Sequence, residues 1–295
     1  FVDQIFASKK NIFKYSKIKF INYLDNNKEI IKYKDNLYIN MRVNFPKIYN
    51  KYFPNQLRID LNNFNIIDIK NFFLKYNKVI LKPTHGAKGQ GIEYFININK
   101  LVNYIFKLKK LNKCYSKKWN RKCYYVMAEI IENLKLYNKK KFHIRTYFLH
   151  SSINNIHKSY IYYKGLIITA KKEYNKNSLD KDVVDTHMKS TEKIKYMTLL
   201  KYEKQFKELF NCVHKLLENN KVNGYNTKNG YQLFGIDILI TDKNIIKLLE
   251  INNMQGMGNH IKKEYNEILT ETFKLTIDKI FSNNDYNSKC YFPVG

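Results

Sequence analysis

The 295-residue chain contains few residues that would crosslink or interrupt it: four cysteines, four prolines, ten glycines and one tryptophan. Cys114, Cys123, Cys212 and Cys290 form no C-x-x-C pair, so neither a zinc site nor a disulfide framework is indicated. A reducing compartment is the simplest expectation. No apolar run approaches the roughly 20 residues that a membrane span needs, and no signal peptide is evident. We therefore expect a soluble, cytoplasmic protein without a membrane partner.

Arginine is also scarce, because Arg42, Arg58, Arg121 and Arg145 are the only four among 53 basic residues. With 25 acidic residues the net charge is +28, and the excess of lysine, together with 39 asparagines, is spread along the whole chain. An even excess of this kind is typical of codon bias. Nucleic-acid surfaces usually rely on arginine, so a nucleic acid is disfavoured as a partner. The charge would still attract an acidic partner at long range.

Hydrophobic residues (44%) and aromatic residues (15%) are abundant, which excludes a disordered chain. The length is sufficient for two or three packed subdomains. Predicted strands and helices are mixed, and hairpins outnumber βαβ units, so we predict an α+β (mixed α/β) fold. Strands are expected at 79–83, 92–96, 124–131, 142–150, 160–169 and twice within 232–252; helices are expected within 61–76, 101–111, 202–218 and 262–281; a polar loop is expected at 175–191.

Three of the ten glycines, Gly86, Gly89 and Gly91, lie close together in a loop between two predicted strands. Glycines allow backbone N–H groups to turn toward an anion, and the flanking Lys82 and Lys88 can neutralise phosphate charge. The order G-x-x-G-x-G is neither the dinucleotide fingerprint nor a P-loop. The pattern predicts either a flap over a triphosphate or an ordinary glycine-rich hairpin.

A second hairpin near the end of the chain carries two acids. With a four-residue loop, Ile240 pairs with Lys247 and Asp237 pairs with Glu250. Alternation then places Asn252 on the same face as Glu250. Directly opposed carboxylates repel each other, and Mg²⁺ prefers carboxylate and amide oxygens combined with phosphate oxygens. We interpret this face as a magnesium site; the alternative is a solvated hairpin with incidental acids.

A third cluster lies on the strand 142–150 and the residue before it. Alternation places Lys141, His143 and Arg145 on one face. Arg145 can hold a carboxylate or a phosphate with two parallel hydrogen bonds. The alternative is a solvated strand face.

These segments, in this order, resemble the tubulin–tyrosine ligase family of ATP-grasp ligases. Residues 79–92 resemble its glycine loop, 141–145 its K-F-D-I-R strand, and 231–252 its F-Q-L-F-G-F-D … I-E-V-N hairpin. The resemblance extends over roughly residues 43–281 and implies an ATP-grasp-like fold, in which two α+β subdomains clasp ATP beside a small N-terminal domain. The implied divisions are 1–77 (N-terminal, substrate side), 78–128 (central, with the glycine-rich flap) and 129–295 (C-terminal, with the metal site).

The resemblance also implies the roles of individual residues. Arg145 and Glu250 would be catalytic, and Asp237, Glu250 and Asn252 would bind Mg²⁺. The contacts with ATP would come from Lys82, Lys88, Gly89, Gln90, Gly91, Ala128, Glu129, Ile131, Lys141 and His143.

Several positions depart from the family pattern. The metal face is intact, whereas the substrate face is altered, so ATP binding is better supported than any named substrate. The departures are Ala128-Glu129 for the hinge Q-K, His143 for the aspartate of K-F-D-I-R, Ile168 for an arginine thought to grip the substrate's tail, and Ser190 for the asparagine of the H-L-T-N segment that begins at His187.

The implied reaction is ATP- and Mg²⁺-dependent amide formation, in which tyrosine is added to the C-terminus of α-tubulin through an acyl-phosphate. The expected partners are the acidic tubulin tail and a free amino acid, met in the cytoplasm or at microtubules. A glutamate- or glycine-adding ligase is the alternative within the family. The departures also motivate a non-catalytic binder of microtubules or nucleic acid, against which the intact acids argue. A protein kinase is a poor fit, because H-R-D and D-F-G motifs are absent.

Overall fold

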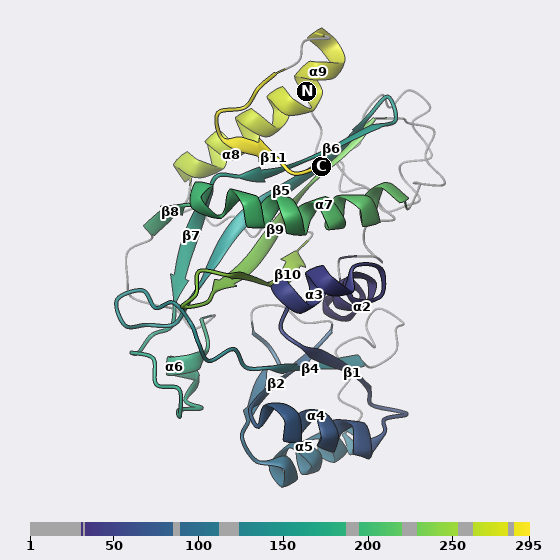
Figure 1. Ribbon diagram of the computed structural model, residues 1–295, viewed down its shortest axis with the longest axis vertical. Helices are drawn as coiled ribbons and strands as arrows, with labels where there is room; N and C mark the ends of the chain where they lie inside the picture. The colour runs from purple at the N-terminus through teal and green to yellow at the C-terminus, as the bar shows by residue number, and fades with distance from the viewer. Residues whose placement is uncertain are drawn as a thin grey trace.

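The computed structural model describes Ile31 and residues 33–84, 89–111, 124–186, 195–219, 229–252, 262–282 and 286–295. Two antiparallel sheets lie one beyond the other along the long axis, with helices between and around them (Figure 1). Every strand pair in the described residues is antiparallel, so the expected mixed α+β fold built from hairpins is confirmed.

The smaller sheet has four strands in the order β1-β4-β2-β3. Two helices, α4 (Ile66–Tyr76) and α5 (Ile98–Lys110), cover one of its faces (Figure 1). Leu81 and Met127 of the sheet are buried in one cluster with Leu101 and Ile105 of α5. The strands are β1 (Gln56–Asp60), β2 (Val79–Pro83), β3 (Glu93–Phe95) and β4 (Tyr124–Glu129).

The larger sheet has seven strands, with the path β10-β9-β5-β6-β11. The long strand β5 pairs with β6 along its second half and with β7 along its first, and β7 continues to β8. The strands are β5 (Phe142–Ile153), β6 (Ile156–Tyr162), β7 (Lys164–Thr169), β8 (Lys195–Thr198), β9 (Gly230–Ile240), β10 (Ile246–Asn252) and β11 (Tyr291–Pro293).

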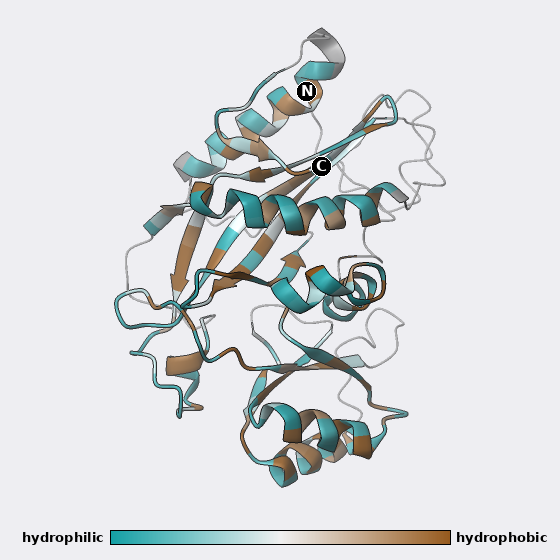
Figure 2. Cartoon of the chain, viewed as in Figure 1, coloured by the Kyte–Doolittle hydropathy of each residue, from teal (hydrophilic) through white to brown (hydrophobic). Residues whose placement is uncertain are grey.

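Both faces of the larger sheet are covered, which explains why every residue of β9 is buried. On one face Phe148 packs against Phe234 and against Phe210 of α7 (Glu203–Asn219), with ring centroids 5.7 and 4.9 Å apart. On the other face Leu233 packs with Ile268 of α8 (Lys262–Leu275). Figure 2 shows apolar residues concentrated along these strands and polar residues along the exposed side of α7. The remaining helices are α2 (Lys34–Asn44), α3 (Pro46–Tyr52), α6 (Lys181–Val184), α9 (Ile277–Ser282) and the 3-10 helix η3 (Leu200–Tyr202).

Asparagine, which is abundant in the sequence, is used at turns and helix starts. Asn65 and Asn97 cap α4 and α5 by accepting hydrogen bonds from the N–H groups of Ile67 and Lys100. Asn154 and Asn155 connect β5 to β6 with φ angles of 51° and 64°, in the left-handed region that two-residue hairpin turns require.

Three expectations for secondary structure need correction. The strand expected at 160–169 is two strands that separate at Tyr163. The helix expected at 262–281 breaks at Thr276, whose hydroxyl donates to the Thr272 carbonyl oxygen at 2.6 Å. The expected loop 175–191, where the structure describes it, contains α6 and the buried side chains of Asp185 and Thr186.

The boundary at residue 77, like that at 128, stays a prediction. A boundary at residue 77 would separate β1 and α4 from β2 and β4, although these four elements pack together around the smaller sheet. The helices α2 and α3 instead join the core beneath the larger sheet, where Tyr38 and Tyr52 are buried with residues of α7.

A chain of polar side chains crosses the interior between the β5–β6 hairpin and α7. The hydroxyl oxygen of Ser159 lies 2.8 Å from Nδ1 of His150 and 2.9 Å from Nδ1 of His214. Nε2 of His150 lies 3.4 Å from Nδ1 of His157, and Nε2 of His214 lies 3.7 Å from Glu218. Suppose that each group donates a hydrogen bond to the next, in the order His157, His150, Ser159, His214 and Glu218. Every contact in this series then has one donor and one acceptor while all three imidazoles are neutral.

Candidate active site

The β9–β10 hairpin has a longer loop than the sequence predicts. Ile240 pairs with Ile246, so the predicted pairing of Ile240 with Lys247 is wrong. The loop contains five residues, 241–245, and its backbone closes through a hydrogen bond from Thr241 N–H to the Ile245 carbonyl oxygen at 2.9 Å.

A β-bulge restores the pairing at the acids. The register shifts between Leu248 and Glu250, and beyond this shift Glu250 lies opposite Asp237, as predicted. The extra residue also reverses the alternation of β10, because Leu248 is buried in the core whereas Glu250 pairs across the other face, beside Asp237.

The three side chains expected to bind a metal converge. The Asn252 amide nitrogen lies 3.0 Å from Oε1 of Glu250 and 3.5 Å from Oδ2 of Asp237. Arg145 holds both oxygens of Asp237, from Nε to Oδ1 and from Nη2 to Oδ2 at 2.7 Å. Lys34, the first residue of α2, lies 3.4 Å from Oε2 of Glu250. Each acid is therefore matched by a cation from a different element.

Lys82 brings the smaller sheet to the same place. Its side chain is buried, and burial lowers the pKa of Lys82 to about 8, with the nearby Glu250 and Asp237 opposing the shift and Lys34 adding to it. Lys82 of β2 is thus close enough to Glu250 and Asp237 of the larger sheet for their charges to change its pKa. The two sheets therefore meet at this site.

The start of β5 carries the third predicted cluster. Burial lowers the pKa of Lys141 to about 8, and Asp185 partly opposes this shift. His143 is buried, with Nδ1 2.6 Å from the Thr186 hydroxyl and Nε2 3.7 Å from Oδ1 of Asp237. The histidine that replaces the family's aspartate therefore lies beside the acidic site. Its neighbour on β7 is Ile168.

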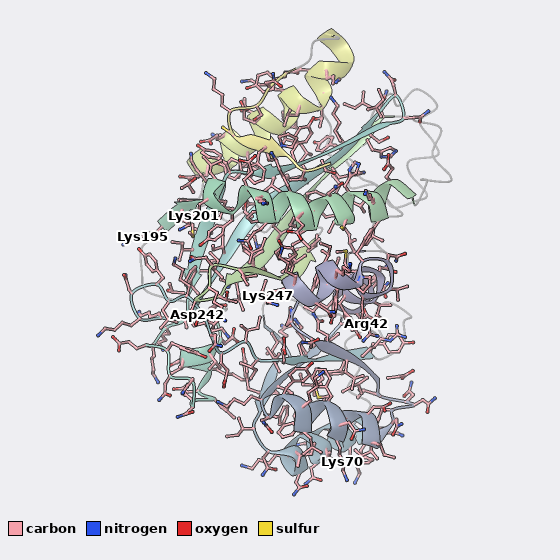
Figure 3. The ribbon with its side chains drawn as sticks, viewed as in Figure 1. Arg42, Lys70, Lys195, Lys201, Asp242 and Lys247 are labelled. Carbon is pink, nitrogen blue, oxygen red and sulfur yellow. The ribbon has the colours of Figure 1, made fainter. Side chains whose placement is uncertain are left out.

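The hinge residues lie at the end of β4. Ala128 is buried in the core, and Ile131 is half-buried in the connection that follows. The Glu129 carboxylate accepts hydrogen bonds from the backbone N–H and side-chain amide of Asn55 at 3.0 and 3.2 Å. Lys247, central in Figure 3, donates to the Phe53 carbonyl oxygen at 3.3 Å, and burial lowers its pKa.

The glycine loop joins β2 and β3 of one antiparallel hairpin, as predicted. Gly89 and Gly91 both have φ near 73°, which L side chains rarely adopt, and Gln90 between them is exposed. Lys88, His187 and Ser190 lie outside the described residues.

The donor set fits a magnesium ion. Two carboxylates and one amide converge, and the amide oxygen of Asn252 would face the cation after a 180° turn of the side chain. Each carboxylate oxygen has two lone pairs, so Asp237 can keep its bonds to Arg145. Within the described residues no group of three or more His, Cys, Asp or Glu side chains has a metal-binding arrangement. Phosphate and water oxygens would therefore complete the coordination.

The sequence did not reveal Lys34, Asp185 or Thr186 as residues of the site. Lys34 lies in a lysine-rich stretch without clear periodicity, and its sequence neighbours give no signal. Asp185 and Thr186 are polar residues in a polar segment, and only the structure shows that they are buried beside Lys141 and His143.

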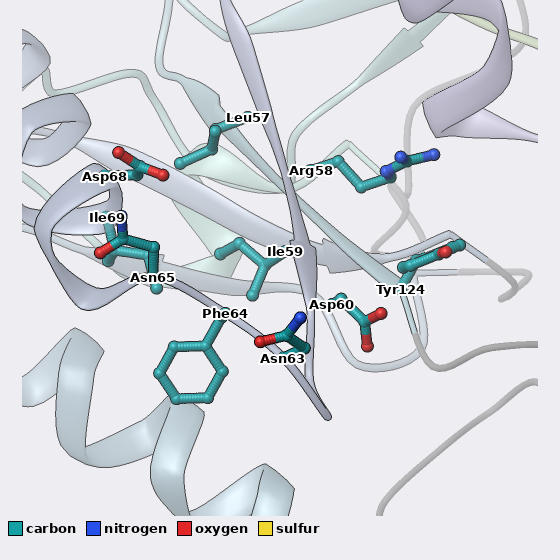
Figure 4. A pocket seen from close by; sticks show the side chains of 10 residues that line it. All are labelled: Leu57, Arg58, Ile59, Asp60, Asn63, Phe64, Asn65, Asp68, Ile69 and Tyr124. Carbon is teal, nitrogen blue, oxygen red and sulfur yellow. The ribbon is translucent and has the colours of Figure 1, made fainter.

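A separate pocket of about 270 Å³ lies on the smaller sheet, beside β1 and the start of α4 (Figure 4). Arg58 stacks over the Tyr124 ring at its rim, 4.6 Å from the ring centroid. None of the predicted site residues lines this pocket.

Binding of a nucleotide at this site is expected to weaken as the pH rises. Lys82 has a pKa of about 8 and loses its charge above that pH, so contact with phosphate oxygens is lost. We expect the Kd for Mg²⁺·ATP to rise by up to about tenfold per pH unit between pH 8 and 9 for each such lysine. Titration calorimetry from pH 7 to 9.5 measures this change. A Lys82→Met variant should bind more weakly at pH 7 and show a shallower pH dependence, whereas an equal slope would rule out Lys82 as the titrating group.

The family model described as "Tubulin-tyrosine ligase family" matches residues 14–211, which is more than half of the chain. A search of curated proteins finds no match. The matched residues include Lys82, Lys141 and Arg145 and end before the acidic hairpin.

No helix in the described part of the chain combines the length and apolar character needed to cross a membrane.

Proposed function

Because this chain belongs to the tubulin-tyrosine ligase family, we propose that it is an ATP- and Mg²⁺-dependent carboxylate–amine ligase that adds tyrosine to the C-terminus of α-tubulin. Family membership implies the ATP-grasp fold and suggests a tubulin-modifying ligase. The observation that carries the proposal is the convergence of Asp237, Glu250 and Asn252 with Arg145 and Lys82 where the two sheets meet. The acidic hairpin lies beyond the matched residues and supports the proposal independently.

Each residue of the site has a defined task in this reaction. Asp237, Glu250 and Asn252 would hold Mg²⁺, and the bound Mg²⁺·ATP supplies the phosphoryl group that activates a carboxylate. Lys82 and Lys141 would place positive charge against phosphate oxygens, in a buried setting where such charge is most effective.

Arg145 is held in place by Asp237. Its Nε and Nη2 atoms bond the carboxylate, which leaves Nη1 able to donate to a phosphate oxygen or to the acceptor's carboxylate. Arg145 would therefore be positioned before any substrate arrives, and such preorganised charge lowers the barrier most effectively.

The acceptor is expected to be an acidic tail. The net charge of +28 draws such a tail toward the protein. The family's tail-gripping arginine is replaced by Ile168, which pairs with His143 beside the site. This replacement favours, as a second candidate, a ligase that adds glutamate or glycine to a side-chain carboxylate.

The test is transfer of labelled tyrosine or labelled glutamate to detyrosinated tubulin with Mg²⁺·ATP, measured together with ADP release. Glu250→Gln keeps the shape of the side chain but removes its charge, and we expect a loss of at least about 100-fold in rate. Glu203→Gln is the matched control, because Glu203 lies on α7 and pairs with Lys207. Transfer of glutamate instead of tyrosine would show that glutamate is the added amino acid, and the proposed reaction mechanism would stand. Absence of both transfer and ATP binding would overturn the proposal.

A further inference from the structure

The outermost strand of the smaller sheet, β1, is paired with β4 along one side, and no other described strand pairs with it. The N–H of Glu129 donates to the carbonyl oxygen of Asn55, the residue opposite it, at 3.0 Å. Hydrogen-bonded pairs alternate along an antiparallel ladder, so the odd-numbered residues of β1 bond β4. The backbone N–H and C=O groups of Arg58 and Asp60 therefore point away from β4, toward the outer edge of the sheet.

This outer edge is covered at its two ends and open between them. At one end the backbone N–H of Gln56 donates to the hydroxyl of the buried Tyr49 of α3. At the other end the Asp60 carbonyl oxygen accepts a hydrogen bond from the Asn63 N–H at 3.1 Å. Within the described residues no group bonds the outward N–H or C=O of Arg58. The pocket of about 270 Å³ lies along this stretch, so there is space beside the edge (Figure 4).

The edge carries two opposite charges on one face. Arg58 and Asp60 lie on the same side of β1, and Ile59 lies on the other side (Figure 4). The Arg58 guanidinium lies over the Tyr124 ring and 3.8 Å from the buried carboxylate of Asp35, while 41% of the Arg58 side chain stays exposed. Edge strands are commonly protected from pairing by lysine. In a chain rich in lysine, this edge instead carries one of the four arginines and an acid.

Opposite charges at this spacing match a second copy of the same strand. Suppose that β1 pairs antiparallel with β1 of another copy, around a two-fold axis at Ile59. Each Arg58 then lies opposite Asp60 of the partner subunit, and both residues have outward backbone groups. Each such pair would exchange two backbone hydrogen bonds and bring opposite charges together. The register that places Arg58 opposite Arg58 of the partner subunit is disfavoured, because it opposes like charges.

We propose that two copies of this chain associate through their β1 edges, so that the two smaller sheets form one continuous antiparallel sheet. The net charge of +28 on each copy opposes association at long range. The charge beside the edge is nevertheless balanced locally, because Asp60 and Asp68 line the pocket and Arg58 is the one cation among its lining residues. A strand of five residues gives a small interface, so the dimer is expected to be weak and to depend on protein concentration.

Sedimentation equilibrium of the full chain at concentrations up to about 1 mM tests this proposal. At about 0.3 M salt the Debye length is about 5–6 Å, so long-range repulsion between the copies is screened. Wild type should dimerise. Arg58→Asp and Asp60→Arg should each weaken self-association about tenfold or more, because each places like charges opposite each other. A mixture of these two variants should form a heterodimer about as tight as the wild-type dimer, because the opposite charges are restored.

A matched control is Lys70→Asp, which changes the net charge as Arg58→Asp does, on the exposed side of α4 (Figure 3). It should leave self-association unchanged. A wild-type protein that stays monomeric up to the highest concentration would overturn the proposal. Dimers that neither charge reversal weakens would also overturn it, because the contact would then lie elsewhere.

A second pair of variants leaves Arg58 and its contact with Asp35 in place. Asp60→Pro removes an N–H that points to the outer edge and keeps the ladder with β4, whereas Asp60→Ala keeps that N–H. Both variants lose the same carboxylate, so weaker self-association of Asp60→Pro measures the backbone pairing alone. Equal association of the two variants, with equal circular dichroism spectra, would contradict pairing through the β1 edge.

Discussion

Replacing Arg145 with methionine is expected to lower the free energy of unfolding by about 3–5 kcal/mol, because it leaves the buried Asp237 carboxylate without its main counter-charge. Asp237 is 3% exposed, and both of its oxygens are bonded to the guanidinium group. Urea denaturation of wild type and variant measures the change. Arg145→Met should also abolish amino-acid transfer, because in the proposed reaction the same guanidinium would bind a phosphate or the acceptor's carboxylate.

A double-mutant cycle separates the unpaired charge from the lost contact. Asp237→Asn removes the charge that Arg145→Met leaves behind, so the double variant should be more stable than the sum of the two single changes predicts. Additive changes in the free energy of unfolding would show that the two side chains are not coupled, contrary to the bidentate contact.

The second large effect is expected on acidification. Burial lowers the pKa of His150 well below its ordinary value, and the neighbouring His214 and His157 add to this. Burial also lowers the pKa of His214, and Glu218 only partly opposes it. The unfolded chain therefore binds more protons than the folded one below about pH 6.5, so this stability is complete above that pH and is lost as the pH falls. For the two histidines together we expect about 2–3 kcal/mol less stability at pH 5.5 than at pH 7.5.

Asparagine is the matched replacement for these two histidines. Its side chain reaches the position of Nδ1, the atom that each histidine presents to Ser159, and it does not titrate between pH 5 and 8. A protein with both His150→Asn and His214→Asn should be less stable at pH 7.5 but should lose less on acidification than wild type, by urea denaturation at both pH values. The same loss in both proteins would assign the acid sensitivity to other groups.

Helices and strands could be predicted from the sequence where their pattern of apolar and polar residues lies within one continuous segment. The two acidic strands, the hairpin of the glycine loop and the amphipathic helix near 202–218 follow from periodicity and turn residues, and all are present. The β-bulge before Glu250 could not be predicted, because it interrupts the alternation on which the prediction depends. The predicted Asp237–Glu250 pair is nevertheless correct, since the longer loop and the bulge compensate each other.

The candidate site was predictable in part for a related reason. Asp237, Glu250 and Asn252 lie within one hairpin, where pairing across the strands joins Asp237 to Glu250 and alternation places Asn252 on the face of Glu250. Lys34 reaches Glu250 from a helix more than 200 residues earlier, and Thr186 reaches His143 from the segment that follows α6. Contacts of this kind depend on how the layers pack, which periodicity does not encode. The domain divisions and the roles of the site residues stay predictions.

The contacts around Glu250 have a consequence for the order in which the protein can mature on the ribosome. Lys34, Lys82 and Arg145 are all synthesised before the acidic hairpin that neutralises them. Until that hairpin emerges from the ribosome, the three cationic side chains lack the acidic groups that neutralise them in the folded protein. Pairings between distant segments also form slowly, because the loop between them must close first. The nascent chain is therefore expected to acquire nucleotide binding, and the stability that a bound nucleotide confers, as one of its last steps.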